Sequence, residues 1–427
     1  TSTTVQVGSA TTIHTTGIDL GNGNLTGHNL HSTGITTSSS VIVGGGVTIS
    51  ESGIEASGIG ITCANINGGA IGGRRNIVNN GAMQVAQRGT SSTTSGMQTV
   101  DRFNCSFSGT DEALTQEQAD VASGTTPYTL GFRKSYKITN GNQTSGAGSS
   151  DAIQIEYKSE SQDIATSGWN FKSATSFITM SFWVKSSVAQ EFQCQLYDPD
   201  ANQAYLFTYT VSSADTWQKI THNVKGDSNL TFNVDNGAGL ECAWYVFIGT
   251  DQTVASPTEN TWATYSGTST KKDAVSTWYT TNDATFELTG VQWEVGSQAT
   301  AFEHRHMAEE LSLCQRYYYR WTAGSTNRYV WMGQSYSTTT CFGIIRELPV
   351  TMRSVPTSSV SGTFTPFGDD GSTSGHSSFS NTNIDQNNVN HSGTSGWGGA
   401  SGVGGGGRAV VVIVSEADGY IDASAEL

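Results

Sequence analysis

The sequence predicts an all-β protein, and three observations support this. Glycine accounts for 50 of the 427 residues, and Thr, Ser and Asn are also abundant, so few segments favour a helix. Ten Trp, fifteen Tyr and sixteen Phe residues supply the side chains of a core and argue against a disordered chain. Several runs alternate apolar and polar residues with the period of a β-strand.

Residues 1–75 are expected to form an intertwined, trimeric β-fibrous shaft. Ile, Leu and Val recur there on short strand-like pieces, which Gly, Asn or Ser residues separate. One copy of such a segment would bury almost no apolar surface, whereas three copies wound about a common axis would enclose these side chains. The alternative is a flexible linker, but linkers lack recurring Ile and Val.

Residues 76–303 are expected to form a jelly-roll β-sandwich, because alternating runs recur between Gly-, Asp- and Asn-containing turns. In the run TFELTGVQWEVG the alternation slips by one residue at Thr289–Gly290, which predicts a β-bulge. The apolar faces of three such runs consist of Ile178, Met180, Phe182 and Val184; Tyr205, Phe207, Tyr209 and Val211; and Phe286, Leu288, Val291, Trp293 and Val295.

Residues 304–321 are expected to form a short helical joint. Glu309 and Glu310 fall in its first turn, where the helix dipole favours negative charge, and both are predicted to be solvated. An apolar stripe at helical spacing is predicted to pack on a neighbouring domain. The stripe consists of Met307, Leu311, Cys314 and Tyr318.

Residues 322–427 are expected to form a small C-terminal β tip with a Gly/Ser/Asn-rich loop at 367–407. The ending RAVVVIVSEADGYIDASAEL predicts a β-hairpin that turns at Asp418–Gly419. The second strand of this hairpin is predicted to bury Ile421, Ala423, Ala425 and Leu427.

Two segments resemble a known family. NIVNNGAMQVAQRGTS with VDRF resembles the opening of jelly-roll modules of bacteriophage tail and fibre proteins, and GVQWEVGSQATAFEHR with EELSLCQRYYYR resembles the close of that module and its exit helix. The module is similar to carbohydrate-binding jelly rolls, while the Gly-rich start and the ending GYIDASAEL resemble marine, cyanophage-type fibre proteins. The resemblance covers roughly 76–321 and both flanks more loosely. It implies a homotrimeric virion appendage, assembled in the host cytoplasm, whose outer end contacts the host surface.

Charge and hydropathy exclude some classes of partner. The net charge of −15 disfavours nucleic acid, because phosphate binding needs a basic surface. No apolar run is long enough for a membrane-spanning helix. The N-terminus lacks the basic start and apolar stretch of a signal peptide, and the absence of an initial Met is expected if N-terminal residues have been removed. The expected partners are two further copies of the chain, other tail or capsid proteins, and a host-surface glycan.

The predicted function is that of a structural virion fibre and adhesin, which binds a host-surface glycan or envelope receptor and is not an enzyme. No GxSxG, HExxH or P-loop motif occurs. One alternative is a trimeric capsule-degrading depolymerase, but the long β-helix with a paired-carboxylate groove that this would need is not visible in the sequence. A second alternative is a purely structural head or tail fibre without a specific ligand.

Exposed aromatic residues on loops are the candidate sugar contacts, because polar, Gly-rich loops with isolated aromatics suit recognition. The loop region 260–283 carries four such residues, and the tip loop carries more. The alternative is that these residues pack in the core or at a trimer contact. The candidates are Trp262, Tyr265, Trp278 and Tyr279 in the first region and Phe367, His376, Phe379, His391 and Trp397 in the second.

Three further interpretations concern the joint and the cysteines. His304 and His306 would point to the same side of an extended strand, so three chains could hold one transition metal with six imidazoles; ordinary exposed histidines are the alternative. Cys194 and Cys242 either form a disulfide or, as preferred for a chain assembled in a reducing cytosol, remain buried thiols. No other cofactor is predicted. Trimer or domain contacts are expected at Leu311, Cys314, Arg316, Tyr318 and Arg320.

Overall fold

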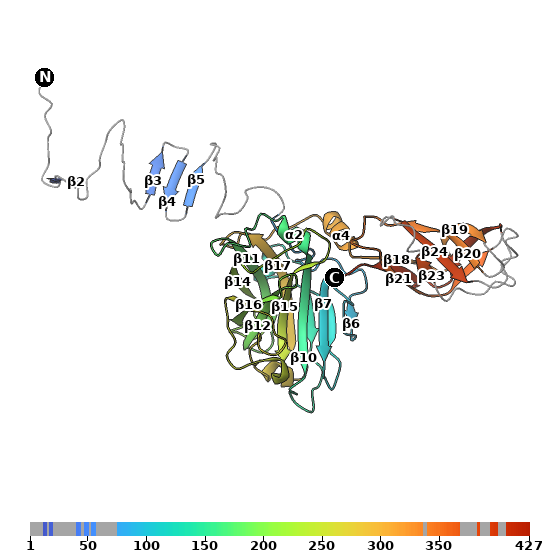
Figure 1. Cartoon of the computed structure of the whole chain (residues 1–427), viewed down its shortest axis with the longest axis horizontal. Helices are drawn as coiled ribbons and strands as arrows, with labels where there is room; N and C mark the ends of the chain where they lie inside the picture. The colour runs from blue at the N-terminus through green and yellow to red at the C-terminus, as the bar shows by residue number, and fades with distance from the viewer. Residues whose placement is uncertain are drawn as a thin grey trace, which may run out of the picture. The chain divides into compact units, whose positions relative to one another are not determined.

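The chain contains two compact units, residues 1–63 and 64–427. The computed structural model describes residues 12–14, 17–19, 40–43, 47–50, 53–56, 75–335, 340–367, 382–384, 393–399 and 407–427. In the first unit, β1 (Thr12–His14) pairs antiparallel with β2 (Gly17–Asp19). A second antiparallel group contains β3 (Ser40–Val43), β4 (Val47–Ser50) and β5 (Gly53–Ala56) (Figure 1). The intertwining of three such chains stays a prediction.

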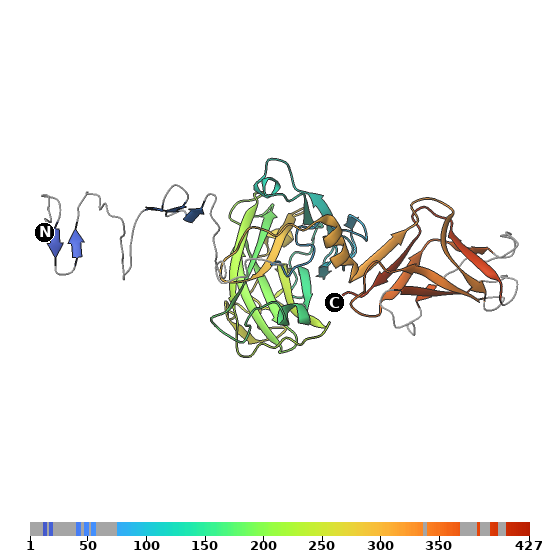
Figure 2. The same ribbon diagram turned by 90° about the horizontal axis from the view of Figure 1, so that it is seen from above.

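The second unit begins with a sandwich of two six-stranded antiparallel sheets (Figures 1 and 2). Successive strands repeatedly switch from one sheet to the other, the arrangement of a jelly roll. In spatial order the first sheet contains β16 (Trp262–Thr264), β13 (Gln203–Thr210), β12 (Glu191–Asp198), β15 (Ala238–Ile248), β10 (Ala152–Glu160) and β7 (Phe103–Ser108). The second contains β14 (Gln218–Lys225), β11 (Phe177–Ser186), β17 (Thr285–Val295), β9 (Lys134–Thr139), β8 (Thr115–Asp120) and β6 (Ser91–Ser92).

Short helical turns connect these strands. They are α1 (Thr126–Thr129), α2 (Ser161–Ala165), the 3₁₀ turn Thr250–Gln252, and α3 (Thr277–Thr280). Within the described part of the chain, no helix is both long and apolar enough to cross a membrane.

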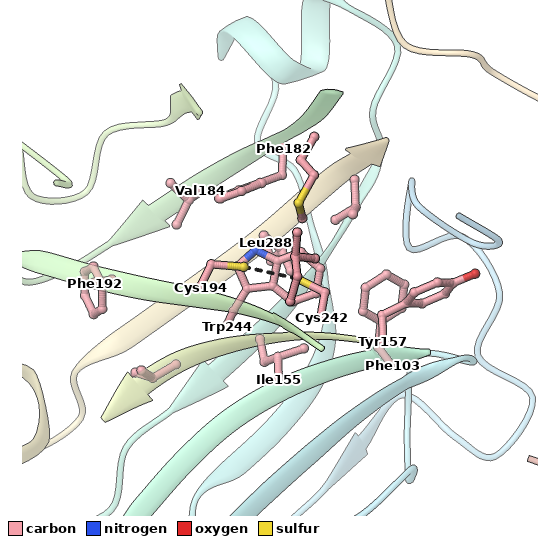
Figure 3. Packing of buried hydrophobic residues seen from close by; sticks show 14 of the residues in the cluster. Phe103, Ile155, Tyr157, Phe182, Val184, Phe192, Cys194, Cys242, Trp244 and Leu288 are labelled. Atoms are coloured by element: carbon pink, nitrogen blue, oxygen red, sulfur yellow. Dashed lines mark hydrogen bonds between the residues drawn. The ribbon is translucent and has the colours of Figure 1, made fainter. Parts of the chain in front are cut away.

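The core lies between the two sheets, as the alternation predicts. Ile178, Met180, Phe182 and Val184 are all fully buried. The indole of Trp244 on β15 packs edge-on against Phe182 on β11, with ring centroids 5.8 Å apart, so the two sheets meet through aromatic contacts (Figure 3). The predicted faces of β13 and β17 are buried in the same cluster, except that Val295 is only half-buried.

The predicted bulge in β17 is confirmed. Ser181 and Trp183 of β11 pair with Gln292 and Thr289 of β17, so β17 contains one extra residue between these pairs. Gly290 adopts a φ of +62°, and a Cβ atom there would lie 2.7 Å from Cζ of Phe132. The bulge therefore requires glycine for both backbone conformation and space.

The two central cysteines lie inside this core as free thiols. Cys194 on β12 and Cys242 on β15 are buried, and their Sγ atoms are 3.1 Å apart (Figure 3). Burial raises the pKa of the Cys242 thiol well above its usual range, so this sulfur is held as an unreactive thiol.

The predicted joint is part helix and part strand. Helix α4 (Met307–Gln315) ends before Tyr318, where β18 (Tyr318–Thr322) begins. Of the predicted stripe only Cys314 and Tyr318 are fully buried, while Met307 is 50% exposed. The prediction that Glu310 is solvated is wrong, because its buried carboxylate accepts the Asn80 N–H and lies 3.6 Å from Arg305.

The C-terminal part contains two further antiparallel sheets, drawn in orange and red in Figure 2. The three-stranded sheet contains β18, β26 (Tyr420–Ser424) and β21 (Thr357–Ser361). The six-stranded sheet contains β22 (Phe364–Phe367), β25 (Ala409–Val414), β19 (Arg328–Ser335), β20 (Thr340–Glu347), β24 (Gly393–Gly399) and β23 (Thr382–Ile384).

The predicted C-terminal hairpin is wrong, although its strands and turn exist. β25 and β26 join different sheets, so they do not pair with each other. The physical reason lies on the polar face of β26, where the buried Asp422 carboxylate accepts the Tyr318 hydroxyl at 2.9 Å and pairs with Arg320 at 3.0 Å. Both edges of β26 are in addition paired, one with β18 and the other with β21, so no edge remains for β25.

Candidate functional site

The outer face of the first sheet carries a polar groove on β12, β15 and β10. Because side chains alternate along a strand, residues that pair across these strands stand side by side on the same face. In three successive rows the pairs are Gln193, Tyr245 and Gln154; Gln195, Ala243 and Glu156; and Tyr197, Glu241 and Lys158.

Ala243 is the small residue at the centre of this surface. Its neighbours Gln195 and Glu156 have long side chains, so the methyl group of Ala243 leaves space between them. The result is a hollow of about 220 Å³. Its lining consists of Gln154, Glu156, Gln195, Tyr197, Glu241, Cys242, Ala243, Tyr245, Gln252, Tyr265 and Lys271.

The loop after β16 forms one wall of the hollow. The Gln195 side chain donates to the Thr270 carbonyl at 2.8 Å, and the Gln193 side chain donates to the Lys272 carbonyl at 2.6 Å. The Lys272 N–H donates back to the Gln193 side-chain oxygen at 2.9 Å. These bonds fix the loop to the sheet, so the wall is held in place by the strand it borders.

Two tyrosines form an aromatic rim. The rings of Tyr197 on β12 and Tyr265 on the loop lie with their centroids 4.7 Å apart, and both residues are half-buried. Asn202 holds the pair, because its carbonyl accepts the Tyr265 N–H at 2.9 Å and its side-chain oxygen accepts the Tyr197 hydroxyl at 3.2 Å. Half-buried tyrosines present an apolar ring face together with a polar hydroxyl.

Two carboxylates line the hollow in different environments. Glu156 accepts the side-chain N–H groups of Gln154 and Asn104, each at 2.7 Å. Glu241 pairs with Lys158 at 3.3 Å, but burial is the larger effect and raises the pKa of Glu241 above its usual value.

The structure corrects the assignment of Trp262 and Trp278 as ligand contacts. Trp262 is 6% exposed and its indole N–H donates to the Lys225 carbonyl at 2.8 Å; Trp278 is fully buried and donates to the Thr285 carbonyl at 2.9 Å. Neither indole offers a face to a ligand. Of the aromatics expected in 260–283, Tyr265 lines the hollow, whereas Tyr279 is buried.

The aromatic and histidine candidates of the tip loop are not placed by the structure. His376, Phe379 and His391 lie outside the described residues. Phe367 and Trp397 belong to β22 and β24, but their side chains are outside the described part. A role for these residues in binding stays a prediction.

The histidine pair lies in an irregular segment, not in the expected strand. The ring of His304 packs against Phe302 and Phe132, and its Nε2 hydrogen-bonds to the Leu130 carbonyl at 2.8 Å. His306 is the exposed N-cap residue of α4. Across the described ranges, no cluster of three or more His, Cys, Asp or Glu side chains could hold a metal ion, so a metal at this pair would need other copies of the chain.

The charged residues of the joint contact other parts of the same unit. The Arg316 guanidinium donates two hydrogen bonds to the Glu160 carboxylate, at 2.5 and 2.8 Å. Arg320 donates to the Arg88 carbonyl at 2.8 Å. Cys314 is buried and Leu311 is half-buried. Contacts with other copies of the chain stay a prediction.

Comparison with models of protein families and with curated proteins finds no match. The similar solved structures include the enzymatically active domain of bacteriophage CBA120 tailspike protein 4, at 10% identity and a TM-score of 0.28 over 52% of this chain and 21% of that one. Another is TmCBM61 in complex with β-1,4-galactotriose, at 7% identity and a TM-score of 0.26 over 53% of this chain and 100% of that one. A third is the N-terminal tandem CBM22-1-CBM22-2 domain of Paenibacillus barcinonensis Xyn10C, at 9% identity and a TM-score of 0.26 over 84% of this chain and 98% of that one. At these values the activities of those proteins do not transfer to this chain.

Proposed function

We propose that this chain binds a glycan in the groove on β12, β15 and β10. The observation behind this proposal is the hollow over Ala243, which has a tyrosine rim and a lining of amide and carboxylate side chains. Sugars present both apolar C–H faces and many hydroxyl groups. A site that combines aromatic rings with polar groups in fixed positions suits them.

The placement of these groups on strands supports the proposal. Gln154, Gln195 and Glu156 project from paired strands whose opposite faces are buried in the core. Side chains on such a sheet keep their positions better than side chains on loops, which reduces the entropy lost on binding.

We further propose that the protein is a homotrimeric bacteriophage virion fibre that acts by adhesion. The recurring Ile and Val residues in the Gly-rich segment 1–75 support this, because one copy of that segment could bury almost none of their apolar surface on its own. Three copies per fibre would make weak single-site contacts with a host-surface glycan effective. Other tail or capsid proteins would hold the fibre on the virion.

A glycan array tests the binding proposal. Ala243→Leu fills the hollow from its floor and should abolish the signals of the wild-type protein. Ala152→Leu adds the same side chain on β10, outside the lining of the hollow, and should leave the signals intact. Equal signals from both variants would rule out this groove as the binding site.

One observation favours a second candidate, a glycoside hydrolase. Glu156 and Glu241 lie in the same hollow on neighbouring strands, and burial raises the pKa of Glu241, as a general acid requires. Glu156 already accepts two side-chain N–H groups, which reduces its availability as a base. Mass spectrometry of bound oligosaccharides decides this: cleavage that is lost in Glu241→Gln would favour the hydrolase, and intact oligosaccharide would favour adhesion.

A further inference from the structure

Lys271 is a buried lysine that lines the proposed glycan groove. The residue is only 2% exposed, yet it contributes to the wall of the hollow. Its ammonium group lies 5.8 Å from the ring centre of Tyr245 and 5.5 Å from that of Tyr265. One of its three N–H groups donates to the Gly267 carbonyl at 3.0 Å.

The ammonium group of Lys271 has no ion-pair partner among the residues that the structure describes. Neighbouring lysines differ: Lys272 pairs with Glu191 at 2.8 Å and with Glu259 at 3.7 Å, and Lys158 pairs with Glu241 at 3.3 Å. Two ring faces and one carbonyl attract a cation but do not neutralise it.

Keeping this lysine buried costs free energy in the unbound protein. Burial without a counter-ion disfavours the charged form, and accordingly it lowers the pKa of Lys271. An anionic ligand group would supply the missing partner. It would also use the two N–H groups of Lys271 that the Gly267 carbonyl does not occupy.

We propose that Lys271 binds an anionic substituent of the glycan, either the carboxylate of an acidic sugar or a sulfate ester. This inference rests on the proposed glycan function of the groove. The anionic group would lie at the Lys271 and Tyr265 end of the hollow, and the neutral part of the sugar would lie over Ala243. The preference is local, because the chain as a whole carries a net charge of −15.

The lining carboxylates do not remove this preference. Glu241 is already paired with Lys158. Glu156 is held by the amides of Gln154 and Asn104. Neither side chain forms an ion pair with Lys271, so the lysine remains the cation available to a ligand in the hollow.

The test uses three polymers and three variants of the full chain. The polymers are polygalacturonate, its carboxyl-reduced neutral counterpart and a sulfated galactan, and binding is measured by affinity electrophoresis. Lys271→Met removes the charge, Lys271→Arg keeps it, and Lys137→Met removes a charge on β9 of the other sheet, which already pairs with Glu117 at 2.7 Å.

We expect the wild-type protein to prefer an anionic polymer to the neutral one. Lys271→Met should weaken that binding about 10- to 100-fold, the usual effect of removing a charge-assisted hydrogen bond. Lys271→Arg should retain most of the affinity and Lys137→Met all of it. The preferred anionic polymer tells carboxylate from sulfate. The unfolding temperature of Lys271→Met should equal or exceed that of the wild-type protein, because the variant removes a buried charge. A purely structural role of Lys271 predicts a lower unfolding temperature instead.

Two results would overturn the inference in distinguishable ways. Equal binding of the neutral and anionic polymers, unchanged in Lys271→Met, would remove the anion preference and leave the glycan function intact. Absence of binding to all three polymers, together with an array that shows no signal, would remove the proposed function as well.

Discussion

Arg102 and Glu426, which are 324 positions apart, form a buried ion pair between the jelly roll and the end of the chain. The Arg102 guanidinium also lies 3.4 Å over the ring of Tyr317, which is two residues beyond the end of α4. Arg88 pairs with the same Glu426 carboxylate at 3.1 Å. The C-terminal residues are therefore an integral part of the second unit.

Removing the charge of Glu426 should destabilise the protein. Glu426→Gln leaves the Arg102 guanidinium, 1% exposed, without its carboxylate, and we expect the free energy of unfolding to fall by about 3 kcal/mol. Urea unfolding measures this. Asp120→Asn removes the exposed pair with Lys134 and should cost less than about 1 kcal/mol. Equal effects of the two substitutions would contradict the buried pair.

The bulge in β17 should not tolerate a side chain. Gly290→Ala combines a φ of +62° with a Cβ atom 2.7 Å from Phe132. Gly324→Ala is the matched control, since Gly324 has a φ of +71° and no atom would lie within 4 Å of its Cβ. We expect Gly324→Ala to cost about 1 kcal/mol and Gly290→Ala clearly more. A smaller effect at Gly290, by urea unfolding, would contradict the packing described for the bulge.

His222 should make the sandwich sensitive to acid. Its ring stacks on Phe207 with centroids 4.0 Å apart, and burial lowers its pKa to about 4. Because the unfolded chain takes up this proton near pH 6.5 and the folded chain only near pH 4, stability is lost as the pH falls between these values. The unfolding temperature of His222→Gln should fall less than that of the wild-type protein over this range. Parallel pH profiles would contradict this assignment.

The trimer proposed for the fibre has a direct test. Light scattering of the full chain should give three times the monomer mass of 45.2 kDa, because residues 1–75 need partner copies to enclose their Ile and Val side chains. A protein that starts at residue 76 should contain fewer than three copies, judged from its measured mass divided by the mass of one truncated chain. A full chain that is monomeric in solution would remove the shaft proposal.

The parts of the fold that depend on local pattern were predictable from the sequence. The buried faces of β11 and β13 follow from strict alternation, and the bulge follows from the one-residue slip at Thr289–Gly290. The separation of the last two strands into different sheets was not predictable, because Asp422 on β26 pairs with Arg320, and no local pattern reveals a partner 102 positions away. The burial of Glu310 is hidden from the sequence for the same reason, because its contact is the distant Asn80.

The groove depends on strand order, which the sequence does not reveal. Glu156, Gln195 and Ala243 become neighbours only when β15 lies between β10 and β12. A signal was present in the polar residues that alternate with apolar ones in QIEYK and QCQLY. Large aromatics are common at sugar sites, but burial in the core is their more frequent role, and Trp262 and Trp278 are both buried.

Hydroxyl-radical footprinting, with and without the glycan that gives the strongest array signal, tests the groove most directly. Tyr197 and Tyr265 form the rim, whereas Tyr329 is 75% exposed and is not part of the lining. We predict that the glycan lowers the oxidation of Tyr197 and Tyr265 and leaves that of Tyr329 unchanged. Unchanged oxidation of both rim tyrosines at saturating glycan would contradict the assignment of this groove as the binding site.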